Sequence, residues 1–151
     1  PDISAAGDCC QGRDLSIDGT RLIGLWANAG MQGETAGRNM AGLDTAYPGN
    51  ILHNITHFMD MDFISFGDKN LPGERKVYLD KGEQYVEATV DGGQVKCINL
   101  LNLFKNSGAV KNYLMRALYR HPTPPDPQME AVLRKSGLPR ELIELLGGNG
   151  Q

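Results

Sequence analysis

The sequence has little of what marks several large classes of protein. Its 151 residues include three cysteines, one tryptophan and only 7% aromatic residues. An odd number of cysteines without a CxxC pair does not suit a disulfide-stapled secreted domain, so we expect a reduced, cytoplasmic protein. No apolar run approaches the roughly 20 residues that span a bilayer. The first residues, PDISAAGD, lack the basic and apolar regions of a signal peptide, so we expect none, and without a spanning run we also expect no membrane partner.

Basic residues are not in excess either. Lys and Arg number 15 against 18 Asp and Glu, which gives a formal net charge of -3. A surface that binds nucleic acid usually needs a basic excess, so we expect no nucleic-acid partner. Hydrophobic residues make up 40% and charged residues 22%, which is typical of a globular chain. The length suits one domain, or one domain with an appendage.

Complete catalytic motifs are also missing. The chain has neither a Walker phosphate-binding loop nor the GxGxxG of a dinucleotide-binding fold. His53 and His57 have the spacing of two metal ligands, but the Glu and the third ligand of a zinc protease are absent. Asp60-Met61-Asp62 lacks the glycine and the terminal Glu of a calcium loop. We therefore predict no catalytic residue and no metal ligand in this chain.

The first part of the chain predicts a strand, a turn and a helix. Residues 3–6 form the expected strand, Gly7-Asp8 the turn, and residues 9–21 a polar loop. Small and apolar residues at three- and four-residue spacing then predict a helix over about 25–43.

Glycine is frequent, at 19 residues, and three glycines fall inside the expected helix, at Gly30, Gly33 and Gly37. Each costs a helix about 1 kcal/mol relative to alanine. They indicate the close approach of another backbone or a flat ligand, or else close packing of the helix on a sheet.

The rest of the chain predicts a small mixed or antiparallel sheet with flanking helices, so the fold class is α+β. β-branched and aromatic residues between turn residues mark the strands, with Gly92-Gly93 as a strong hairpin signal. The expected strands cover about 52–58, 62–67, 75–80, 84–91 and 94–103. Strand 84–91 alternates Tyr85, Glu87 and Thr89 with Val86, Ala88 and Val90, which predicts one buried face.

Helices are expected after the sheet. Residues 109–120 are amphipathic, with Ser107 as a possible N-cap. A proline-rich linker over 121–127 precedes a short helix capped by Asp126, and a last helix follows Pro139. We thus expect three parts: 1–46, a strand-turn-helix remnant; 47–121, an α+β domain; and 122–151, a proline-linked helical tail.

Residues 1–49 carry several short motifs in a specific order. They are Pro1-Asp2-Ile3-Ser4-Ala5-Ala6-Gly7-Asp8-Cys9, Gly24-Leu25-Trp26-Ala27-Asn28-Ala29, Gln32-Gly33, Ala36-Gly37-Arg38-Asn39-Met40-Ala41-Gly42 and Tyr47-Pro48-Gly49. With this combination the chain resembles the FAD-dependent pyridine nucleotide-disulfide oxidoreductases, nearest to the rubredoxin reductase and nitrite reductase branch. A weaker likeness to the C-terminal domain of that branch continues to about Arg120.

The resemblance implies residues that contact the flavin. Asp8 would accept a hydrogen bond from a ribityl hydroxyl of FAD, and Gly7 would leave room for the ligand. The helix that begins near Trp26 would direct its backbone N–H groups and positive dipole end at the N1/O2 edge of the flavin. Leu25, Trp26 and Ala27 would lie at that helix end. Taken alone, Asp8 would be an ordinary turn residue and Trp26 a core residue.

The resemblance also implies what is missing. In this family, glycine-rich folds upstream bind the ADP half of FAD and NAD(P)H, and neither is present here. FAD therefore belongs to the parent protein and is expected to be absent from this chain or bound very weakly. The cysteine pair Cys9-Cys10 is not the redox-active disulfide that some members carry, because that disulfide also lies upstream.

The resulting hypothesis is that the chain is the C-terminal portion of an FAD-dependent NAD(P)H oxidoreductase and is inactive alone. The start at Pro1, without Met, indicates a piece of a larger protein. Its partners would be the remainder of the parent chain and, as is common in this family, a second copy in a homodimer that packs through the sheet. The alternative is a stand-alone, non-catalytic interaction or dimerisation module that binds through an exposed sheet edge. An upstream sequence with glycine-rich nucleotide folds would favour the flavoenzyme, and a natural start codon would favour the module.

Overall fold

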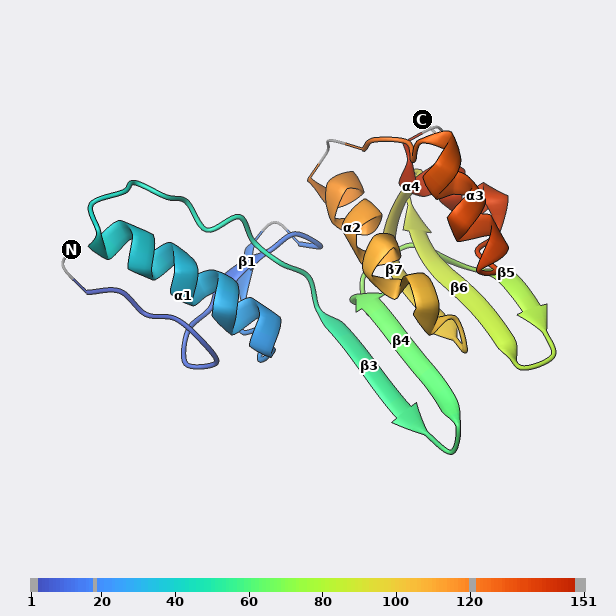
Figure 1. Cartoon of the computed structure of the whole chain (residues 1–151), viewed down its shortest axis with the longest axis horizontal. Helices are drawn as coiled ribbons and strands as arrows, with labels where there is room; N and C mark the ends of the chain where they lie inside the picture. The colour runs from blue at the N-terminus through green and yellow to red at the C-terminus, as the bar shows by residue number, and fades with distance from the viewer. Residues whose placement is uncertain (1–2, 18, 120–121, 149–151) are drawn as a thin grey trace. The chain divides into compact units, whose positions relative to one another are not determined.

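The computed structural model describes residues 3–17, 19–119 and 122–148. The chain divides into two compact units, Pro1–Ile51 and Leu52–Gln151 (Figure 1). This boundary lies a few residues after the expected boundary at residue 46.

The first unit contains a small two-stranded antiparallel sheet and one helix. Its elements are β1 (Gly12–Asp14), β2 (Gly19–Arg21) and α1 (Trp26–Met40). The expected helix is confirmed and is shorter than the predicted 25–43. The expected strand over residues 3–6 is wrong, because an extended segment becomes a strand only beside a hydrogen-bonded neighbour, and none lies among the described residues. The predicted loop over 9–21 was also wrong in part, since it contains β1 and β2.

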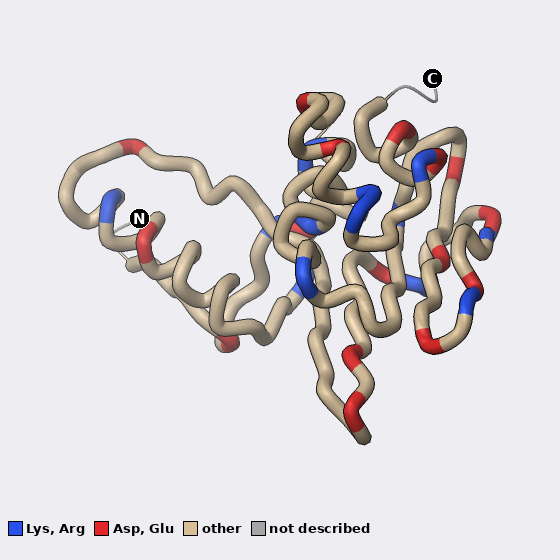
Figure 2. The backbone as a smooth tube through the Cα atoms, turned by 45° about the vertical axis from the view of Figure 1, so that its right-hand side comes forward, with Lys and Arg blue, Asp and Glu red and all other residues tan. Residues whose placement is uncertain are grey.

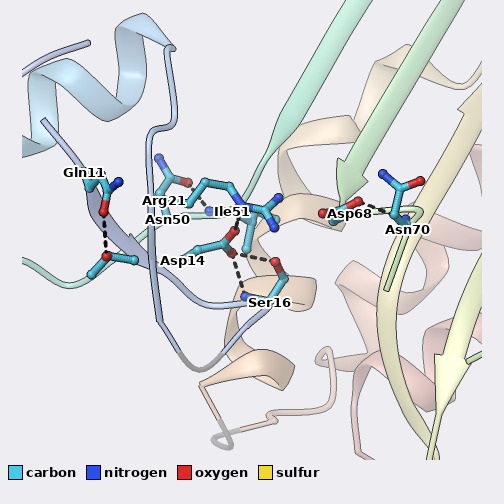
Figure 3. Close-up of polar contacts among 9 residues, drawn as sticks. Gln11, Asp14, Ser16, Arg21, Asn50, Ile51, Asp68 and Asn70 are labelled. Carbon is cyan, nitrogen blue, oxygen red and sulfur yellow. Dashed lines mark hydrogen bonds and ion pairs between the residues drawn. The ribbon is translucent and has the colours of Figure 1, made fainter. Parts of the chain in front are cut away.

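Buried polar groups hold the first unit together. The Oδ1 atom of Asp14 accepts hydrogen bonds from the backbone N–H and the hydroxyl of Ser16, at 2.8 and 2.6 Å (Figure 3). The Nε atom of Arg21 lies 3.2 Å from the other carboxylate oxygen of Asp14. Asn28 of α1 donates to the carbonyl of Ile23 at 2.8 Å and accepts from the hydroxyl of Tyr47 at 2.5 Å. Side-chain hydrogen bonds thus replace part of an apolar core in this unit.

The second unit is a five-stranded antiparallel sheet with helices on one face (Figure 1). The strand order is β3-β4-β7-β6-β5. The elements are β3 (His53–Phe58), β4 (Met61–Gly67), β5 (Glu74–Lys81), β6 (Gln84–Asp91), β7 (Gln94–Leu101), a 3-10 turn η1 (Phe104–Asn106), α2 (Ser107–Leu118), α3 (Pro127–Lys135) and α4 (Arg140–Leu146). All five expected strands are confirmed, and the α+β class with them.

The main core lies between this sheet and its helices. Ile64, Phe66, Ile98 and Leu100 of the sheet are buried, as is Leu114 of α2. Further buried apolar residues on the helices are Val110, Ala117, Leu118, Leu133, Leu142, Ile143 and Leu146. The helices α3 and α4 therefore belong to the second unit and do not form the separate tail expected for 122–151.

Strand β6 is buried on both faces at its centre. Val86 and Ala88 point to one side, while Glu87 and Thr89, which point to the other, are only 6% and 8% exposed. The prediction of one buried face was therefore incomplete. Strand β6 lies between β7 and β5, and neighbouring residues cover its side chains on both faces.

The predicted caps have different outcomes. Asp126 accepts a hydrogen bond from the backbone N–H of Met129 at 2.8 Å and caps α3, with Pro127 in the first turn. Ser107 is not the N-cap of α2, because it is the first helical residue and Asn106 holds the cap position without a side-chain bond. The predicted end of this helix at residue 120 and the start of the linker at 121 lie outside the described residues.

Candidate functional site

The turn at Gly7 is held against helix α1 by a side-chain hydrogen bond. Gly7 has a φ of 96°, a conformation that side chains with a Cβ rarely adopt, and the space where its Cβ would lie is open. Its backbone N–H donates to the Oε1 atom of Gln32 at 2.8 Å, and its carbonyl accepts from the backbone N–H of Cys10 at 3.2 Å. The turn is thus formed by glycine and fixed in place by a helix side chain.

Gln32 is a residue that the sequence analysis did not assign to the site. It lies on α1 and is only 6% exposed. Its Oε1 atom also accepts from the thiol of Cys10 at 3.4 Å. Its Nε2 atom is buried and has no hydrogen-bond partner among the described residues. The sequence held one signal for this role, which is a large amide side chain next to Gly33 in a helix rich in small residues.

Asp8 is the next residue of the turn, and it is exposed. A Cβ on Gly24 would lie 3.7 Å from its carboxyl carbon, so the carboxylate reaches the segment that leads into α1. The structure gives this carboxylate no hydrogen-bond or ion-pair partner among the described residues. Asp8 is therefore available to accept a hydrogen bond.

The N-terminus of α1 lies two residues after Gly24. Leu25 is the N-cap, makes no side-chain cap bond, and is followed by no acidic residue in the first turn. Trp26 is 96% exposed and Ala27 is also exposed, so Trp26 is not a core residue of this unit. The first N–H groups of the helix are thus donors without a side-chain cap, and they follow closely after Gly24, beside which the Asp8 carboxylate lies.

The turn and the helix end together contain one acceptor and several donors. Asp8 could accept from a hydroxyl, and the helix end could donate to an electron-rich edge and stabilise negative charge on it. The donor and acceptor types match the ribityl hydroxyls and the N1/O2 edge that the resemblance assigns to them. A structural role for Asp8 near the positive helix end is compatible with the same geometry.

The three helix glycines have open space beside them. Apart from the chain neighbours and the backbone of the helix itself, no atom of a described residue lies within 4 Å of the Cβ position of Gly30, Gly33 or Gly37. Within the described residues, neither another backbone nor a sheet packs against these glycines, and the approach of a flat ligand stays a prediction.

Other candidate sites gain no support. The Nδ1 atom of His57 pairs with the carboxylate of Asp62 across the β3–β4 hairpin, and its ring stacks edge-on against Phe104 at 5.4 Å. In the described part of the chain, no three His, Cys, Asp or Glu residues are grouped to hold a metal ion. No helix among these residues is both long and apolar enough to cross a membrane.

The helix-free face of the sheet carries a polar network that the sequence did not reveal. The Glu87 carboxylate accepts from Arg75 Nε at 2.7 Å, and from the Tyr85 hydroxyl and Asn99 Nδ2 at 2.8 Å each. Burial raises the pKa of Glu87, but the hydrogen bonds from Asn99, Arg75 and Tyr85 and the charge of Arg75 outweigh it and lower the pKa overall. The nearby Cys97 thiol is buried, and burial raises its pKa to about 11.

The comparisons with known proteins give similarity in structure only. No protein-family model matches the sequence, and no curated protein does. An FAD-dependent pyridine nucleotide-disulphide oxidoreductase from Desulfovibrio vulgaris superposes on 99% of this chain and 38% of its own, with a TM-score of 0.68 and 18% identity. An NAD-dependent persulfide reductase from A. fulgidus superposes on 77% of this chain and 25% of its own, with a TM-score of 0.61 and 16% identity. An engineered water-forming NADPH oxidase superposes on 80% of this chain and 31% of its own, with a TM-score of 0.64 and 21% identity.

These similarities confirm the predicted resemblance at the level of fold. The chain has the α+β fold of part of an FAD-dependent pyridine nucleotide-disulfide oxidoreductase. It spans about a quarter to two fifths of the length of the solved structures that it matches. The rubredoxin reductase and nitrite reductase branch stays a prediction.

Proposed function

We propose that this chain is the C-terminal portion of an FAD-dependent NAD(P)H oxidoreductase, to which it contributes a flavin-contacting turn and helix end and an interface domain. The observation that carries the proposal is the superposition of 99% of the chain on 38% of the Desulfovibrio vulgaris enzyme. The remainder of the parent protein would supply the glycine-rich folds for NAD(P)H and for the ADP half of FAD.

Each proposed contact has a separate task. Asp8 would accept from a ribityl hydroxyl of FAD, beside the open space at Gly7. The backbone N–H groups at Trp26 and Ala27 would donate to the flavin rim, whereas the N–H of Leu25 already donates to the carbonyl of Ile23 at 2.9 Å, so Leu25 would only lie beside that rim. When bound, FAD would supply the chemistry by accepting hydride from NAD(P)H. Gln32 would act as a positioning residue, because it fixes the turn that bears Asp8 to the helix that bears the donors.

The uncapped helix end supports this role. A helix terminus that is buried without partners for its N–H groups is unfavourable. At an exposed terminus, water can bond these groups until a ligand replaces it. The exposed apolar groups around the first unit also fit a surface that the remainder of a parent protein would cover: Ile3, Leu22, Trp26, Met40 and Leu43 are between 51% and 96% exposed.

The test uses the chain together with the coding sequence that precedes Pro1 in its gene. We expect the longer protein to purify with visible flavin absorbance and to oxidise NAD(P)H. In it, Asp8→Asn should weaken FAD binding roughly tenfold, because a charged acceptor is replaced by a neutral one. Asp44→Asn, at an exposed position of the same unit, is the matched control and should leave FAD affinity unchanged.

The 151-residue chain is measured in parallel. We expect neither tight FAD binding nor NADH oxidation from it, since most cofactor contacts would lie elsewhere in the parent. A longer protein that binds no flavin would overturn the proposal. Tight FAD binding with unaided NADH oxidation by the chain itself would overturn the claim that it is inactive alone.

One observation favours the alternative, a stand-alone interaction or dimerisation module. Strand β3, at one edge of the five-stranded sheet, contains no Lys, Arg, Asp, Glu or Pro (Figure 2), and an edge of this kind can accept another strand. A start codon immediately before Pro1, with no upstream nucleotide-binding folds, would decide for that alternative.

A further inference from the structure

The helix-free face of the five-stranded sheet is hollowed over β4, β7 and β6. One cavity, of about 780 Å³, is lined by this face and by the loop that follows β4, and its lining includes Ser65, Glu87 and Asn99. A second cavity, of about 260 Å³, shares these three residues with it. Small-molecule sites usually have volumes of about 300–1,000 Å³. The joined cavities therefore have the size of a ligand site, and no role proposed above uses them.

The register of the strands arranges the side chains of this face in three rows that cross the sheet. The first row is apolar and consists of Phe63, Leu101 and Tyr85. The second row is polar and consists of Ser65, Asn99 and Glu87. The third row consists of Gly67, Cys97 and Thr89, with Arg75 of β5 opposite Thr89. Because a strand rises about 3.3 Å per residue, neighbouring rows lie roughly 6–7 Å apart.

The first row lines the smaller cavity with apolar and aromatic side chains. Phe63 is 44% exposed, and Tyr85 and Leu101 are half-buried. An exposed aromatic ring beside a cavity presents a face on which a planar ring of a ligand can stack. This end of the joined cavities therefore suits an aromatic group.

The second row provides neutral hydrogen-bonding groups. Ser65 contributes a hydroxyl and Asn99 an amide, and both line the two cavities. Hydroxyl and amide groups each donate and accept, so they match the hydroxyl groups of a ligand. The Glu87 carboxylate at the end of this row already accepts from Arg75, Tyr85 and Asn99.

An unpaired positive charge lies beside the third row. Lys69, two residues after Gly67, is exposed and lines the larger cavity. The neighbouring Asp68 carboxylate accepts from the backbone N–H of Asn70 at 2.9 Å, which turns the loop (Figure 3). Within the described part of the chain, Lys69 pairs with no carboxylate. A phosphate of a ligand would supply the missing partner through charge-assisted hydrogen bonds.

We propose that the joined cavities bind a nucleoside monophosphate. The base stacks on Phe63, the sugar hydroxyls bond with Ser65 and Asn99, and the phosphate pairs with Lys69. An aromatic ring, a sugar and a phosphate follow each other in such a ligand, in the same order as the three rows. The inference goes beyond the flavin role proposed above and does not depend on it, because all of these residues belong to the second unit.

The experiment compares one nucleotide with its two halves. Adenosine monophosphate (AMP), adenosine and ribose phosphate are titrated into the 151-residue chain, and binding is followed by the NMR shifts of backbone amides. Adenosine lacks the phosphate, and ribose phosphate lacks the base. We expect AMP to bind roughly tenfold more tightly than either half, because only AMP contacts all three rows. Amides of β4, β7 and residues 68–70 should shift, whereas amides of α1 should not.

Two variants at exposed positions separate the ends of the site. Lys69→Gln should weaken AMP and ribose phosphate roughly tenfold and leave adenosine unchanged, because it removes only the charge. Phe63→Ala should weaken AMP and adenosine roughly tenfold and leave ribose phosphate unchanged, because it removes only the stacking surface. Lys135→Gln, at an exposed position of α3, is the matched control and should change no affinity. Circular dichroism checks that each variant is folded.

Several results would overturn the proposal. One is the absence of shifts at the cavity amides with about 10 mM AMP. Another is AMP binding that a folded Lys69→Gln or Phe63→Ala variant does not weaken. Equal affinity for AMP and ribose phosphate would assign the cavity to phosphates without a base. Equal affinity for AMP and adenosine would show that the ligand needs no phosphate, and either equality rules out a nucleoside monophosphate as the specific ligand.

Discussion

Glu87 is the buried charge on which the helix-free face of the sheet is organised. Its side chain is only 8% exposed, while its ion-pair partner Arg75 is 70% exposed. A buried carboxylate is tolerated here because both of its oxygens accept hydrogen bonds. Sequence alternation placed Glu87 on one face of β6, but it could not show that Asn99, twelve residues away, would donate to it.

The pKa of Glu87 predicts how stability depends on pH. Because folding lowers this pKa, the carboxylate stabilises the folded state above the ordinary glutamate pKa, and that contribution is lost as the pH falls through the folded-state pKa. Glu87→Gln should destabilise the protein by roughly 1–3 kcal/mol at pH 7. The difference from the native chain should narrow below about pH 4.

Urea unfolding of both proteins at several pH values, followed by circular dichroism, measures this difference. Glu83→Gln, which removes one negative charge from an exposed position, is the matched control. A destabilisation by Glu87→Gln that is equal at pH 3 and pH 7 would contradict the prediction.

Gln32 is the residue that fixes the Gly7 turn, and its replacement tests that role. Gln32→Leu removes the acceptor for the Gly7 N–H and should destabilise the folded turn by roughly 1–3 kcal/mol. We expect the Gly7 amide to exchange with solvent roughly ten times faster or more, as measured by hydrogen exchange. Glu34→Gln, on an exposed position of the same helix, should not change that rate. An unchanged Gly7 rate in Gln32→Leu would show that the turn holds without the helix.

At the scale of elements, the β3–β4 hairpin combines a regular ladder with an unusual turn. Met59 and Asp60 have φ values of 48° and 62°, the left-handed conformation that a tight two-residue hairpin needs. Asn-Gly or Gly-Gly usually fills such a turn, as Gly92-Gly93 does between β6 and β7. The sequence predicted a break near Asp60 but gave no Asn-Gly or Gly-Gly signal, because Met59 rarely adopts this conformation and Asp60 adopts it less readily than glycine.

The strained turn predicts a stabilising substitution. Replacing Met59→Asn together with Asp60→Gly should stabilise the second unit by about 1 kcal/mol, since both new residues tolerate the left-handed region. Gly92→Ala, in the other hairpin, should have the opposite effect because it introduces the strain that glycine avoids. Urea unfolding followed by circular dichroism compares the variants. If the double variant is no more stable than the native chain, the turn stores no strain.

The elements that the sequence predicted well have local signals. Strands β5, β6 and β7 were found from β-branched residues between glycine turns, and α3 from its Asp126 cap and Pro127. The errors lie where the outcome depends on distant residues. The three-residue strands β1 and β2 have no alternation to detect, and residues 3–6 have strand composition without a pairing neighbour.

Only part of the candidate site could be predicted from the sequence, because only part of it has local signals. Gly7, Asp8 and the helix end at Trp26 form short motifs with a recognisable order, and the structure places Asp8 near the segment leading into α1. Gln32 was missed because its hydrogen bond to Gly7 spans 25 residues. Composition and spacing cannot show such a bond.

At the scale of the whole molecule, the two units differ in how they are stabilised. Among its described residues, the first unit buries three apolar side chains, Leu15, Ile23 and Ile51, beside the polar groups Asp14, Ser16, Asn28, Gln32 and Asn50. Each buried apolar side chain contributes roughly 1.5–3 kcal/mol, whereas ordering each residue costs about 1–2 kcal/mol. The second unit has a continuous apolar core under α2 and α4. The first unit should therefore be the weaker one.

We expect the chain to lose its structure in two steps as urea is added. Amides of β1, β2 and α1 should lose protection from hydrogen exchange at lower urea than amides of β4, β6 and β7. Simultaneous loss of protection in both units would contradict this. In the longer protein proposed above, FAD and the remainder of the parent would cover the helix end and the exposed apolar residues of the first unit. Its amides should then become protected to higher urea, because a ligand that binds only the folded state stabilises it in proportion to its affinity.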